Sequence, residues 1–281
     1  MEVAAANATG DDWVCPDAGW SHRWSRCRLL LWGGRPNWYA VRDVGKLPAD
    51  RQNDLAAYGY QLIINTQRYL GPDVADAAMR FAGNNLACGN CHLRAGLQPF
   101  AAPFVSTYTT FPMMVDDRVI TLSERINGCM TRSMNGRALP ADGHEMEALL
   151  AYIEFLGQGT PTGIRVAGMG LRPVSQPDRR PDAGRGQRVY VAQCARCHGE
   201  DGQGRLRSAQ PRDGYEAPPV WGEGSFNSAA GMNRLTTASA FVHANMPFGV
   251  DEGAAPISPQ DAWDVAAFFT SQPRPPGPLR D

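Results

Sequence analysis

Apolar residues recur at intervals of three and four along four segments of the chain, which is the pattern of helices with one buried face. Two of these segments lie near residues 55–69 and 186–194, and the other two are predicted helices over residues 143–157 and 259–271. No stretch alternates apolar and polar residues for long enough to predict a useful strand. The pattern therefore predicts a mainly α protein.

The starts of the two later helices carry their own signals. Asp142 is followed three residues later by Glu145, which predicts a capping box with Asp142 as the N-cap. Ser258 is the predicted N-cap of the last helix, and Pro259 then takes the first helical position, where a missing N–H does no harm.

Residues 158–184 are rich in Pro, Gly and Arg and predict an extended linker. They separate residues 41–157 from residues 185–276, and each of these parts contains one early and one late helix. Residues 1–40 read as an irregular N-terminal arm without an assigned function. A length of 281 residues suits this arrangement of two small helical domains.

The charge is balanced, with 27 Lys and Arg against 28 Asp and Glu, so the sequence gives no reason to expect a nucleic-acid partner. No run approaches 18 consecutive apolar residues, which argues against a transmembrane segment. Two details stand out within this ordinary composition. Lys46 is the only lysine, and the seven cysteines are an odd number.

Four of the cysteines lie in two copies of a C-x-x-C-H motif. The copies read Cys88-Gly-Asn-Cys91-His92 and Cys194-Ala-Arg-Cys197-His198. This is the attachment signature of c-type haem, in which each thiol adds to one vinyl group and the histidine becomes an axial ligand of the iron. A zinc ribbon is the weaker alternative, because the motifs are more than 100 residues apart, and a redox C-x-x-C lacks its βαβ context. We therefore predict two covalently attached haems.

Covalent haem attachment of this type takes place outside the cytoplasm in bacteria, so the motifs predict an exported, periplasmic protein. The first ten residues show neither the basic start nor the long apolar stretch of a signal peptide. A disulfide between Cys15 and Cys27 is chemically allowed in that compartment, and the sequence does not decide it.

Each iron needs a second axial ligand or an open position. For the second haem, Met246 lies in Asn245-Met-Pro-Phe-Gly, ahead of the last helix, where small cytochromes c place a methionine. Met232 is the competing candidate, and His243 is a weaker one. A lysine ligand is excluded, since Lys46 is the sole lysine.

For the first haem, the equivalent position falls on Cys129 and Met130, and three interpretations stay open. Met130 or Met134 is an ordinary ligand, or Cys129 is an inert buried thiol, or Cys129 is a thiolate ligand with a chemical role. Thiolate ligation lowers a haem potential relative to methionine. Four arginines flank this segment: Arg118, Arg125, Arg132 and Arg137. They favour a thiolate and a dianionic substrate, although haem propionates and solvent are also common partners of arginine.

Taken together, these motifs resemble those of the dihaem thiosulfate dehydrogenases, the tetrathionate-forming cytochromes c. The resemblance runs from about Asn37 to Phe269. It rests on Cys88-x-x-Cys91-His92, Arg125-Ile-Asn-Gly-Cys129, Arg132-Ser133-Met134-Asn135-Gly136, Cys194-x-x-Cys197-His198 and Asn245-Met246-Pro247. The Arg125-to-Cys129 segment is the specific part, because class I cytochromes at large lack it.

The resemblance implies two cytochrome c-like helical haem domains with unequal roles. His92 and Cys129 would be the axial ligands of a catalytic haem 1, and His198 and Met246 those of an electron-transfer haem 2. Arg118, Arg125 and Ser133 would bind the anionic substrate around Cys129. Some members of the family carry a lysine beside or instead of the methionine, where this chain has Asn245.

The implied reaction joins two thiosulfate ions into one tetrathionate, with electrons passing from haem 1 to haem 2 and to an external acceptor such as a small cytochrome c. The reverse reaction, tetrathionate reduction, stays open. Two alternatives are a non-catalytic dihaem electron-transfer protein and a partner-dependent cytochrome subunit of sulfur oxidation. The preferred direction, the acceptor and the oligomeric state are beyond what the sequence predicts.

Overall fold

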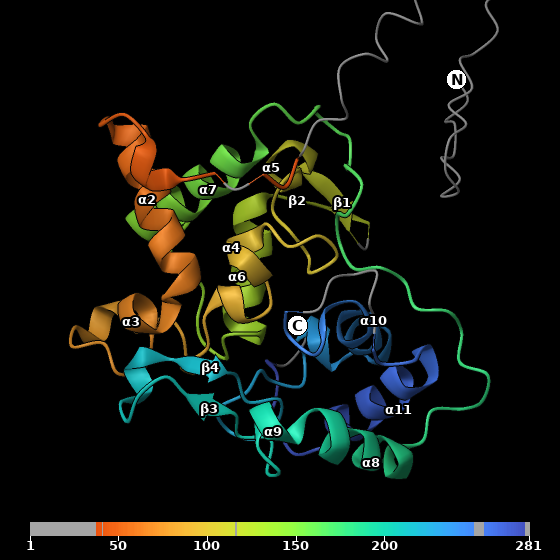
Figure 1. The fold of residues 1–281 in the computed structure, drawn as a ribbon. Helices are drawn as coiled ribbons and strands as arrows, with labels where there is room; N and C mark the ends of the chain where they lie inside the picture. Colours follow the sequence, from red (N-terminus) through yellow and green to blue (C-terminus); the bar gives the residue numbers. More distant parts are fainter. Residues whose placement is uncertain (1–37, 41, 116, 250–255, 279–281) are drawn as a thin grey trace, which may run out of the picture. The chain divides into compact units, whose positions relative to one another are not determined.

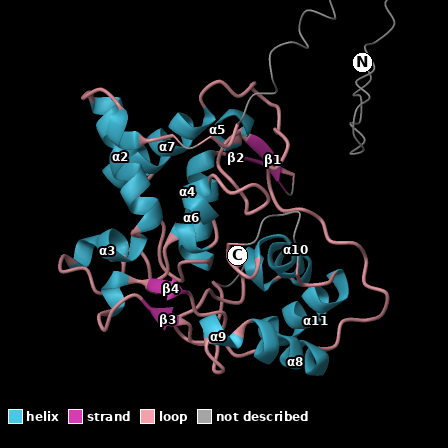
Figure 2. Cartoon of the chain, in the orientation of Figure 1, coloured by secondary structure: helices cyan, strands magenta, loops and turns pink. Residues whose placement is uncertain are grey.

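The computed structural model describes residues 38–40, 42–115, 117–249 and 256–278. Figure 1 shows these residues as a mainly helical chain, and Figure 2 shows how little strand accompanies the helices. The predicted mainly α fold is therefore confirmed. Cys15 and Cys27, and with them the question of their disulfide, lie outside the described residues.

We call residues 38–157 the first half, residues 158–182 the connector and residues 183–278 the second half. The first half contains six α-helices and one antiparallel hairpin among its described residues. Their bounds are α2 Arg51–Ile64, α3 Thr66–Leu70, α4 Leu93–Gly96, α5 Thr107–Thr110, β1 Met113–Val115, β2 Arg118–Ile120, α6 Leu122–Arg132 and α7 His144–Gly157. Three short 3-10 helices accompany them: η1 Val44–Lys46, η2 Ala77–Met79 and η3 Cys88–Asn90.

The second half repeats the plan with fewer elements. Its described elements are α8 Ala183–Gln193, α9 Ala195–His198, β3 Arg205–Leu206, η4 Pro211–Asp213, β4 Tyr215–Ala217, η5 Gly231–Asn233, α10 Leu235–Asn245 and α11 Pro259–Thr270. The strands β3 and β4 pair antiparallel in a second small hairpin.

In each half an early helix crosses a late helix at a glycine. In Figure 1, α2 (orange) packs on α7 (green), and α8 (teal) packs on α11 (blue). A Cβ atom on Gly59 of α2 would lie 2.0 Å from the carbonyl oxygen of Ala148, and one on Gly186 of α8 would lie 1.9 Å from that of Asp264. Only glycine allows the backbones to approach this closely, so the same device builds both crossings.

Each half also has its own hydrophobic core, built mainly on these crossings. The first core centres on α2 and α7, where Leu62, Met146 and Leu156 are fully buried. The second centres on α11, where Ala262 and Ala266 are fully buried. A third, small cluster joins the halves, because Leu93 and Ala101 of the first half pack with Phe241 of the second.

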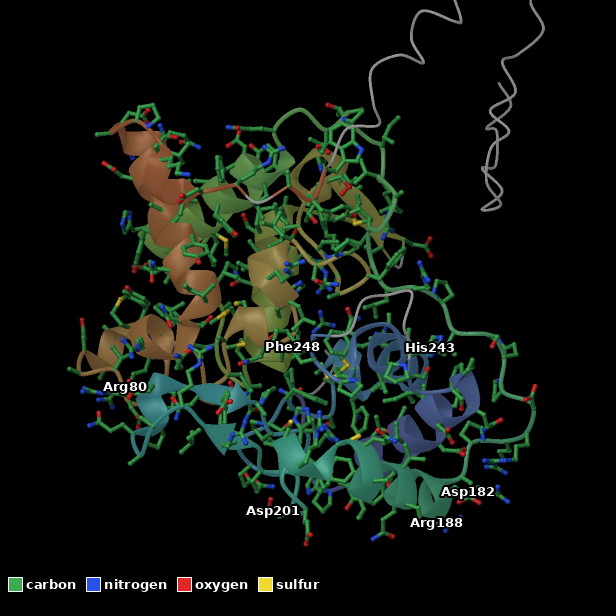
Figure 3. The ribbon with its side chains drawn as sticks, viewed as in Figure 1. Arg80, Asp182, Arg188, Asp201, His243 and Phe248 are labelled. Carbon is green, nitrogen blue, oxygen red and sulfur yellow. The ribbon has the colours of Figure 1, made fainter. Side chains whose placement is uncertain are left out.

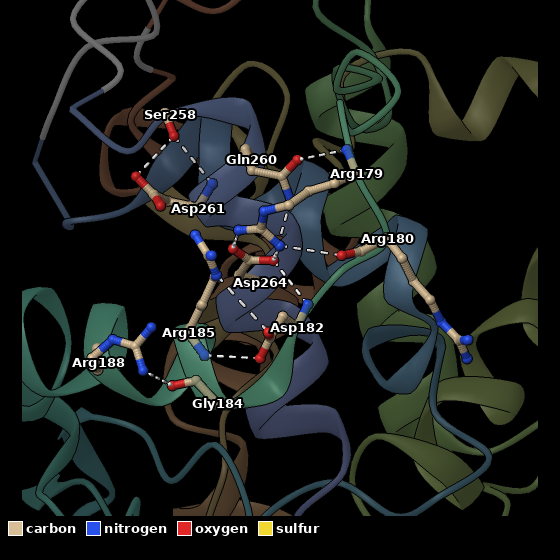
Figure 4. Close-up of polar contacts among 10 residues, drawn as sticks. All are labelled: Arg179, Arg180, Asp182, Gly184, Arg185, Arg188, Ser258, Gln260, Asp261 and Asp264. Carbon is tan, nitrogen blue, oxygen red and sulfur yellow. Dashed lines mark hydrogen bonds and ion pairs between the residues drawn. The ribbon is translucent and has the colours of Figure 1, made fainter.

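The connector contains no helix, as predicted, and it is bonded to both halves. The N–H groups of Phe100 and Ala102 donate to the carbonyl oxygens of Gly168 and Gly170 at 2.7 and 2.9 Å. Further along, Arg179 forms a bidentate ion pair with the buried carboxylate of Asp264 on α11, as Figure 4 shows. The connector is therefore packed in place rather than a loose tether.

The structure corrects one predicted helix cap and confirms the other. Gly143 N–H donates to the carbonyl of Pro140 at 3.1 Å, and this turn leaves Asp142 outside the helix, so Gly143 is the N-cap of α7. The capping box predicted on Asp142 is wrong. Ser258 caps α11 as predicted, because its hydroxyl accepts from the N–H of Asp261 at 3.1 Å.

Two helices that the sequence pattern did not predict, α6 and α10, carry candidate ligands. Cys129 lies inside α6 and Met246 is the C-cap of α10. Cys129 thus lies within a helix rather than in a loop, whereas Met246 lies in the loop that follows α10 and precedes α11. Helix α6 is amphipathic, with Leu122, Ile126 and Met130 on one face, whereas α10 has small residues on several sides.

Candidate functional site

The first C-x-x-C-H motif is held in a tight turn between α2 and α4. The N–H of His92 donates to the carbonyl of Cys88 at 2.9 Å, which brings both ends of the motif into one helical turn. Thr66, the first residue of α3, fixes this turn, because its hydroxyl accepts from the N–H of Cys88 at 3.0 Å and lies 3.4 Å from the Sγ of Cys88. Thr66 is 1 % exposed, and no sequence motif predicts this role.

Both cysteines of this motif are partly buried. Burial raises the pKa of Cys88 to about 11, against the lowering effect of Thr66. Burial likewise raises the pKa of Cys91 to about 12, and the nearby sulfur of Cys129 adds to the shift. Both motif thiols are therefore protonated at neutral pH. Cys129 affects the pKa of both motif thiols electrostatically, so it lies near the motif, although it is about 40 residues away in the chain.

His92 is oriented by its own backbone contact. Its Nδ1–H donates to the carbonyl of Ala102 at 2.6 Å, which leaves Nε2 with its lone pair. The ring of Phe104 lies 4.4 Å away, centroid to centroid. Burial lowers the pKa of His92 to about 4, and the charge of Arg125 lowers it further, so the imidazole is neutral at physiological pH.

The second motif has the same construction at the end of α8. The N–H of His198 donates to the carbonyl of Cys194 at 3.0 Å, and its Nδ1–H donates to the carbonyl of Pro218 at 2.7 Å. Burial raises the pKa of Cys194 to about 11 and lowers that of His198. Two halves that share little sequence outside the motif thus present the same pair of thiols and the same free Nε2.

Met246 and Met232 are both partly buried against the second core and the small cluster between the halves. Their packing alone does not separate the two candidates for the second haem. The Nδ1–H of His243 donates to the carbonyl of Ile257 at 2.8 Å, a contact of the same kind as those that orient His92 and His198. Figure 3 labels His243 and, just beyond Met246, Phe248, whose side chain is 72 % exposed.

Cys129 sits on the C-terminal half of α6, and Arg125 lies one turn before it on the same helix. A guanidinium N–H of Arg125 is directed at the sulfur of Cys129, with Nη1 and Sγ 3.4 Å apart. The start of α6 is marked by a capping box between Thr121 and Glu124. This T-x-x-E pattern is the signal from which the helix could have been predicted.

The other candidate residues around Cys129 have different surroundings. Arg118 on β2 is largely exposed and pairs with Glu124 at 3.4 Å. Ser133 is the C-cap of α6, one turn after Cys129. Arg132 donates to the carbonyl of Gly128 at 2.6 Å, and Arg137 donates to backbone carbonyls and stacks 3.8 Å over the ring of Phe81. Arg132 and Arg137 therefore serve the fold, and Arg125 is the arginine at the thiol.

The methionines proposed as alternatives to Cys129 lie in the first core. Met130 is 2 % exposed and Met134 is 3 % exposed, and both pack among apolar side chains. Cys129 is instead partly buried, beside the guanidinium of Arg125 and the thiols of the first motif.

These groups fit covalent haem. A thioether forms when a neutral thiol adds to a vinyl group, which suits protonated thiols, and each neutral histidine would offer Nε2 to the iron of a bound haem. The four motif cysteines do not converge on one metal ion, since the described residues contain no group of three or more His, Cys, Asp or Glu side chains arranged to hold one. The fold and these two sites define a two-domain c-type cytochrome.

Comparisons with known proteins agree with this class. Residues 79–162 match the family model described as SoxA/TsdA, cytochrome c domain, and residues 183–273 match the model described as cytochrome c. A thiosulfate dehydrogenase of Allochromatium vinosum is 43 % identical over 220 residues, covering 76 % of this chain and 78 % of its own. A thiosulfate dehydrogenase of Stutzerimonas stutzeri is 39 % identical over 234 residues, covering 83 % and 71 %.

A solved structure, the as-isolated form of the thiosulfate dehydrogenase TsdBA from Marichromatium purpuratum, is similar with a TM-score of 0.76 at 33 % identity. The match covers 85 % of this chain and 50 % of that one, so this chain spans about half the length of that protein. The chain belongs to the thiosulfate dehydrogenase family. The resemblance expected from the sequence is confirmed, as are two cytochrome c domains with two c-type haems. Among the described residues, no helix has the length and apolar character needed to cross a bilayer.

Proposed function

We propose that this protein oxidises two thiosulfate ions to one tetrathionate, with Cys129 as the catalytic residue and, together with His92, as an axial ligand of the first haem. The observation that carries this proposal is the contact between Arg125 and Cys129, placed beside the first C-x-x-C-H motif. A sulfur nucleophile and a guanidinium at one point suit a substrate that is both a sulfur compound and a dianion.

Cys88, Cys91 and His92 hold the first haem in this proposal, and Cys194, Cys197 and His198 hold the second, with Met246 as its sixth ligand. The bound haems supply acceptors for one electron each. The burial and orientation of the thiols and of the two imidazoles support these assignments.

The proposed reaction at Cys129 takes place in two steps. The Cys129 thiolate and the terminal sulfur of one thiosulfate form an S–S bond and release two electrons, which gives a cysteine S-thiosulfonate. A second thiosulfate then attacks the outer sulfur of that bond, which forms tetrathionate and returns the Cys129 thiolate. Arg125 is placed to hold the anion at Cys129 and to offset the repulsion between two dianions. Arg118 and Ser133 are further candidates for anion binding.

We further propose that the protein works in the periplasm and passes its electrons to an external acceptor such as a small cytochrome c. Covalent haem attachment supports the compartment. The exposed Phe248, two residues after Met246, offers an apolar contact for such an acceptor near the second haem.

The decisive experiment compares haem-loaded wild type with Cys129→Gly. Wild type is expected to reduce ferricyanide with thiosulfate as the donor, and Cys129→Gly is expected to lose nearly all of this activity while both haems stay attached. The low-spin thiolate-type electron paramagnetic resonance signal is expected to disappear in the same variant.

Met130→Leu and Met134→Leu are the matched controls, because they replace the alternative thioether ligands by a side chain of similar volume. Both are expected to keep the signal and the activity. Full activity in Cys129→Gly would contradict the catalytic role of Cys129. Loss of the axial ligand in either methionine variant would contradict the role of Cys129 as the ligand of the first haem.

A further inference from the structure

The helix that carries Cys129 ends inside the protein, where its last carbonyl groups need hydrogen-bond donors. The first half supplies donors for some of them. The carbonyl of Cys129 accepts from the N–H of Ser133 at 2.8 Å, and that of Met130 accepts from Gly136 at 3.0 Å. The next two carbonyls, of Thr131 and Arg132, obtain their donors from elsewhere.

Both of these donors belong to Asn227, a residue of the second half. Its side-chain amide donates to the carbonyl of Thr131 at 2.9 Å, and its backbone N–H donates to that of Arg132 at 3.1 Å. The same amide lies 3.3 Å from the side-chain oxygen of Asn135. Asn227 is 1 % exposed, so water cannot replace it at these carbonyls.

The side-chain oxygen of Asn227 is also used, because it accepts from the N–H of Ala229 at 3.1 Å. Every polar group of this side chain thus has a partner. A second buried asparagine, Asn84 of the first half, reinforces the junction by donating to the carbonyls of Ser133 and Ser225, both at 3.1 Å. The end of α6 is therefore joined by hydrogen bonds to residues 225–227.

These residues lead back to the second motif. The hydroxyl of Ser225 donates to the carbonyl of Pro219 at 3.2 Å, and the neighbouring carbonyl of Pro218 accepts from Nδ1 of His198. One short segment, residues 218–227, thus orients the histidine of the second motif and completes the end of the helix that carries Cys129.

We propose that Asn227 is a positioning residue for Cys129: a residue of the second cytochrome c domain that fixes the rotation and depth of α6 and so sets how Cys129 faces the first haem site. This inference rests on the proposed role of Cys129. The two domains then have a second relation besides electron transfer, because the catalytic cysteine is held in register by the domain that receives the electrons.

A positioning role follows from the geometry of a helix. Thr131 and Arg132 lie two and three residues beyond Cys129, so a tilt of α6 at its last turn moves the sulfur with it. Displacements of about 1 Å at a reacting group can cost about 100-fold in rate. Removing the amide takes away the donor to the Thr131 carbonyl, which favours such a displacement.

The test uses haem-loaded Asn227→Ala. We expect the thiolate-type electron paramagnetic resonance signal of the first haem to shift in g-values or lose intensity. We also expect kcat for thiosulfate to fall about 10-fold, while the KM for thiosulfate changes much less. The near-infrared charge-transfer band of the His/Met haem is expected to stay as in wild type.

Gln272→Ala is the matched control. The side-chain amide of Gln272 donates to the carbonyl of Phe268 at 3.1 Å, near the end of α11. The substitution therefore removes the same kind of contact from a helix that does not carry Cys129. It is expected to leave the thiolate signal and turnover unchanged. If Asn227→Ala yields no haem-loaded protein, Asn227→Ser decides, because its hydroxyl can still accept from the Ala229 N–H and is too short to reach Thr131.

Unchanged signal and turnover in the Asn227 variant would overturn the proposal, as would an equal loss at both haems or an equal effect of Gln272→Ala. The outcome is separable from that of the proposed function. If wild type shows the thiolate signal and no thiosulfate turnover, the proposed reaction fails, and the g-values of the Asn227 variant still decide whether Asn227 positions Cys129.

Discussion

The carboxylate of Asp264 should be the most sensitive polar group of the second half. It is 1 % exposed on α11 and accepts four hydrogen bonds. Two come from the guanidinium of Arg179 in the connector, one from the N–H of Asp182 at 2.9 Å and one from Gln260 at 3.1 Å (Figure 4). Substitution by alanine leaves these donors without their acceptor.

The expected loss of stability depends on whether each donor regains a hydrogen bond to water once the carboxylate is removed. Arg179 is 36 % exposed and regains water, and Gln260 is only partly buried, so both recover much of their bonding. The N–H of Asp182, at the start of α8, loses its acceptor within the fold. The loss of this contact together with a broken ion pair to a buried carboxylate is expected to lower the free energy of unfolding by about 3 kcal/mol. For a chain of this size that corresponds to about 6–12 °C in Tm.

The assay is thermal unfolding of the haem-loaded protein followed by far-UV circular dichroism, with Asp261→Ala as the control. Asp261 carries the same charge on the same helix and bonds mainly to Ser258, so its loss is expected to cost less than about 1 kcal/mol. A Tm for Asp264→Ala within about 2 °C of wild type would refute the reasoning, as would equal effects of the two variants.

The same carboxylate predicts a pH dependence. Burial alone would raise the pKa of Asp264, but the hydrogen bonds from Arg179, Asp182 and Gln260 outweigh it and leave the pKa below its ordinary value of 3.8. The stabilisation by the charged form is therefore complete above that value and is lost as the pH falls through the lower folded pKa. The difference in Tm between wild type and Asp264→Ala is expected to shrink at pH values below 3.8 and to persist at pH 7.

Two further predictions concern the helix crossings and the second haem. Gly186→Ala is expected to destabilise the protein by about 2 kcal/mol or more, because its Cβ would overlap the carbonyl oxygen of Asp264, whereas Gly231→Ala, with open space around its Cβ, is expected to change the Tm by no more than about 2 °C. Met246→Ala is expected to abolish the charge-transfer band of the His/Met haem and to leave the thiolate signal intact, with Met232→Ala as the control. Retention of the band in Met246→Ala together with its loss in Met232→Ala would reassign the ligand.

The sequence alone was sufficient wherever the information lies within a few residues. A C-x-x-C-H motif fits in one helical turn, so its spacing alone predicts covalent haem attachment. The hydrogen bonds from the N–H of His92 to Cys88 and from the N–H of His198 to Cys194 form that turn in the structure. The helices α7 and α11 were likewise predictable, because each buries a continuous apolar face. The cap at Ser258 was predicted correctly for the same local reason, since its acceptor and donor are three residues apart.

Tertiary structure decided what depends on partners far apart in the chain. Helix α6 has a local capping signal at Thr121 and Glu124, but its end is completed by Asn227 from another domain, and no pattern within the helix predicts that contact. Of four arginines that look alike in the sequence, only the fold directs Arg125 to Cys129 and Arg137 to the backbone. Local hydrogen bonds and periodicity can be predicted from order along the chain, whereas a buried polar group takes whichever donor the packing of distant segments brings within about 3 Å.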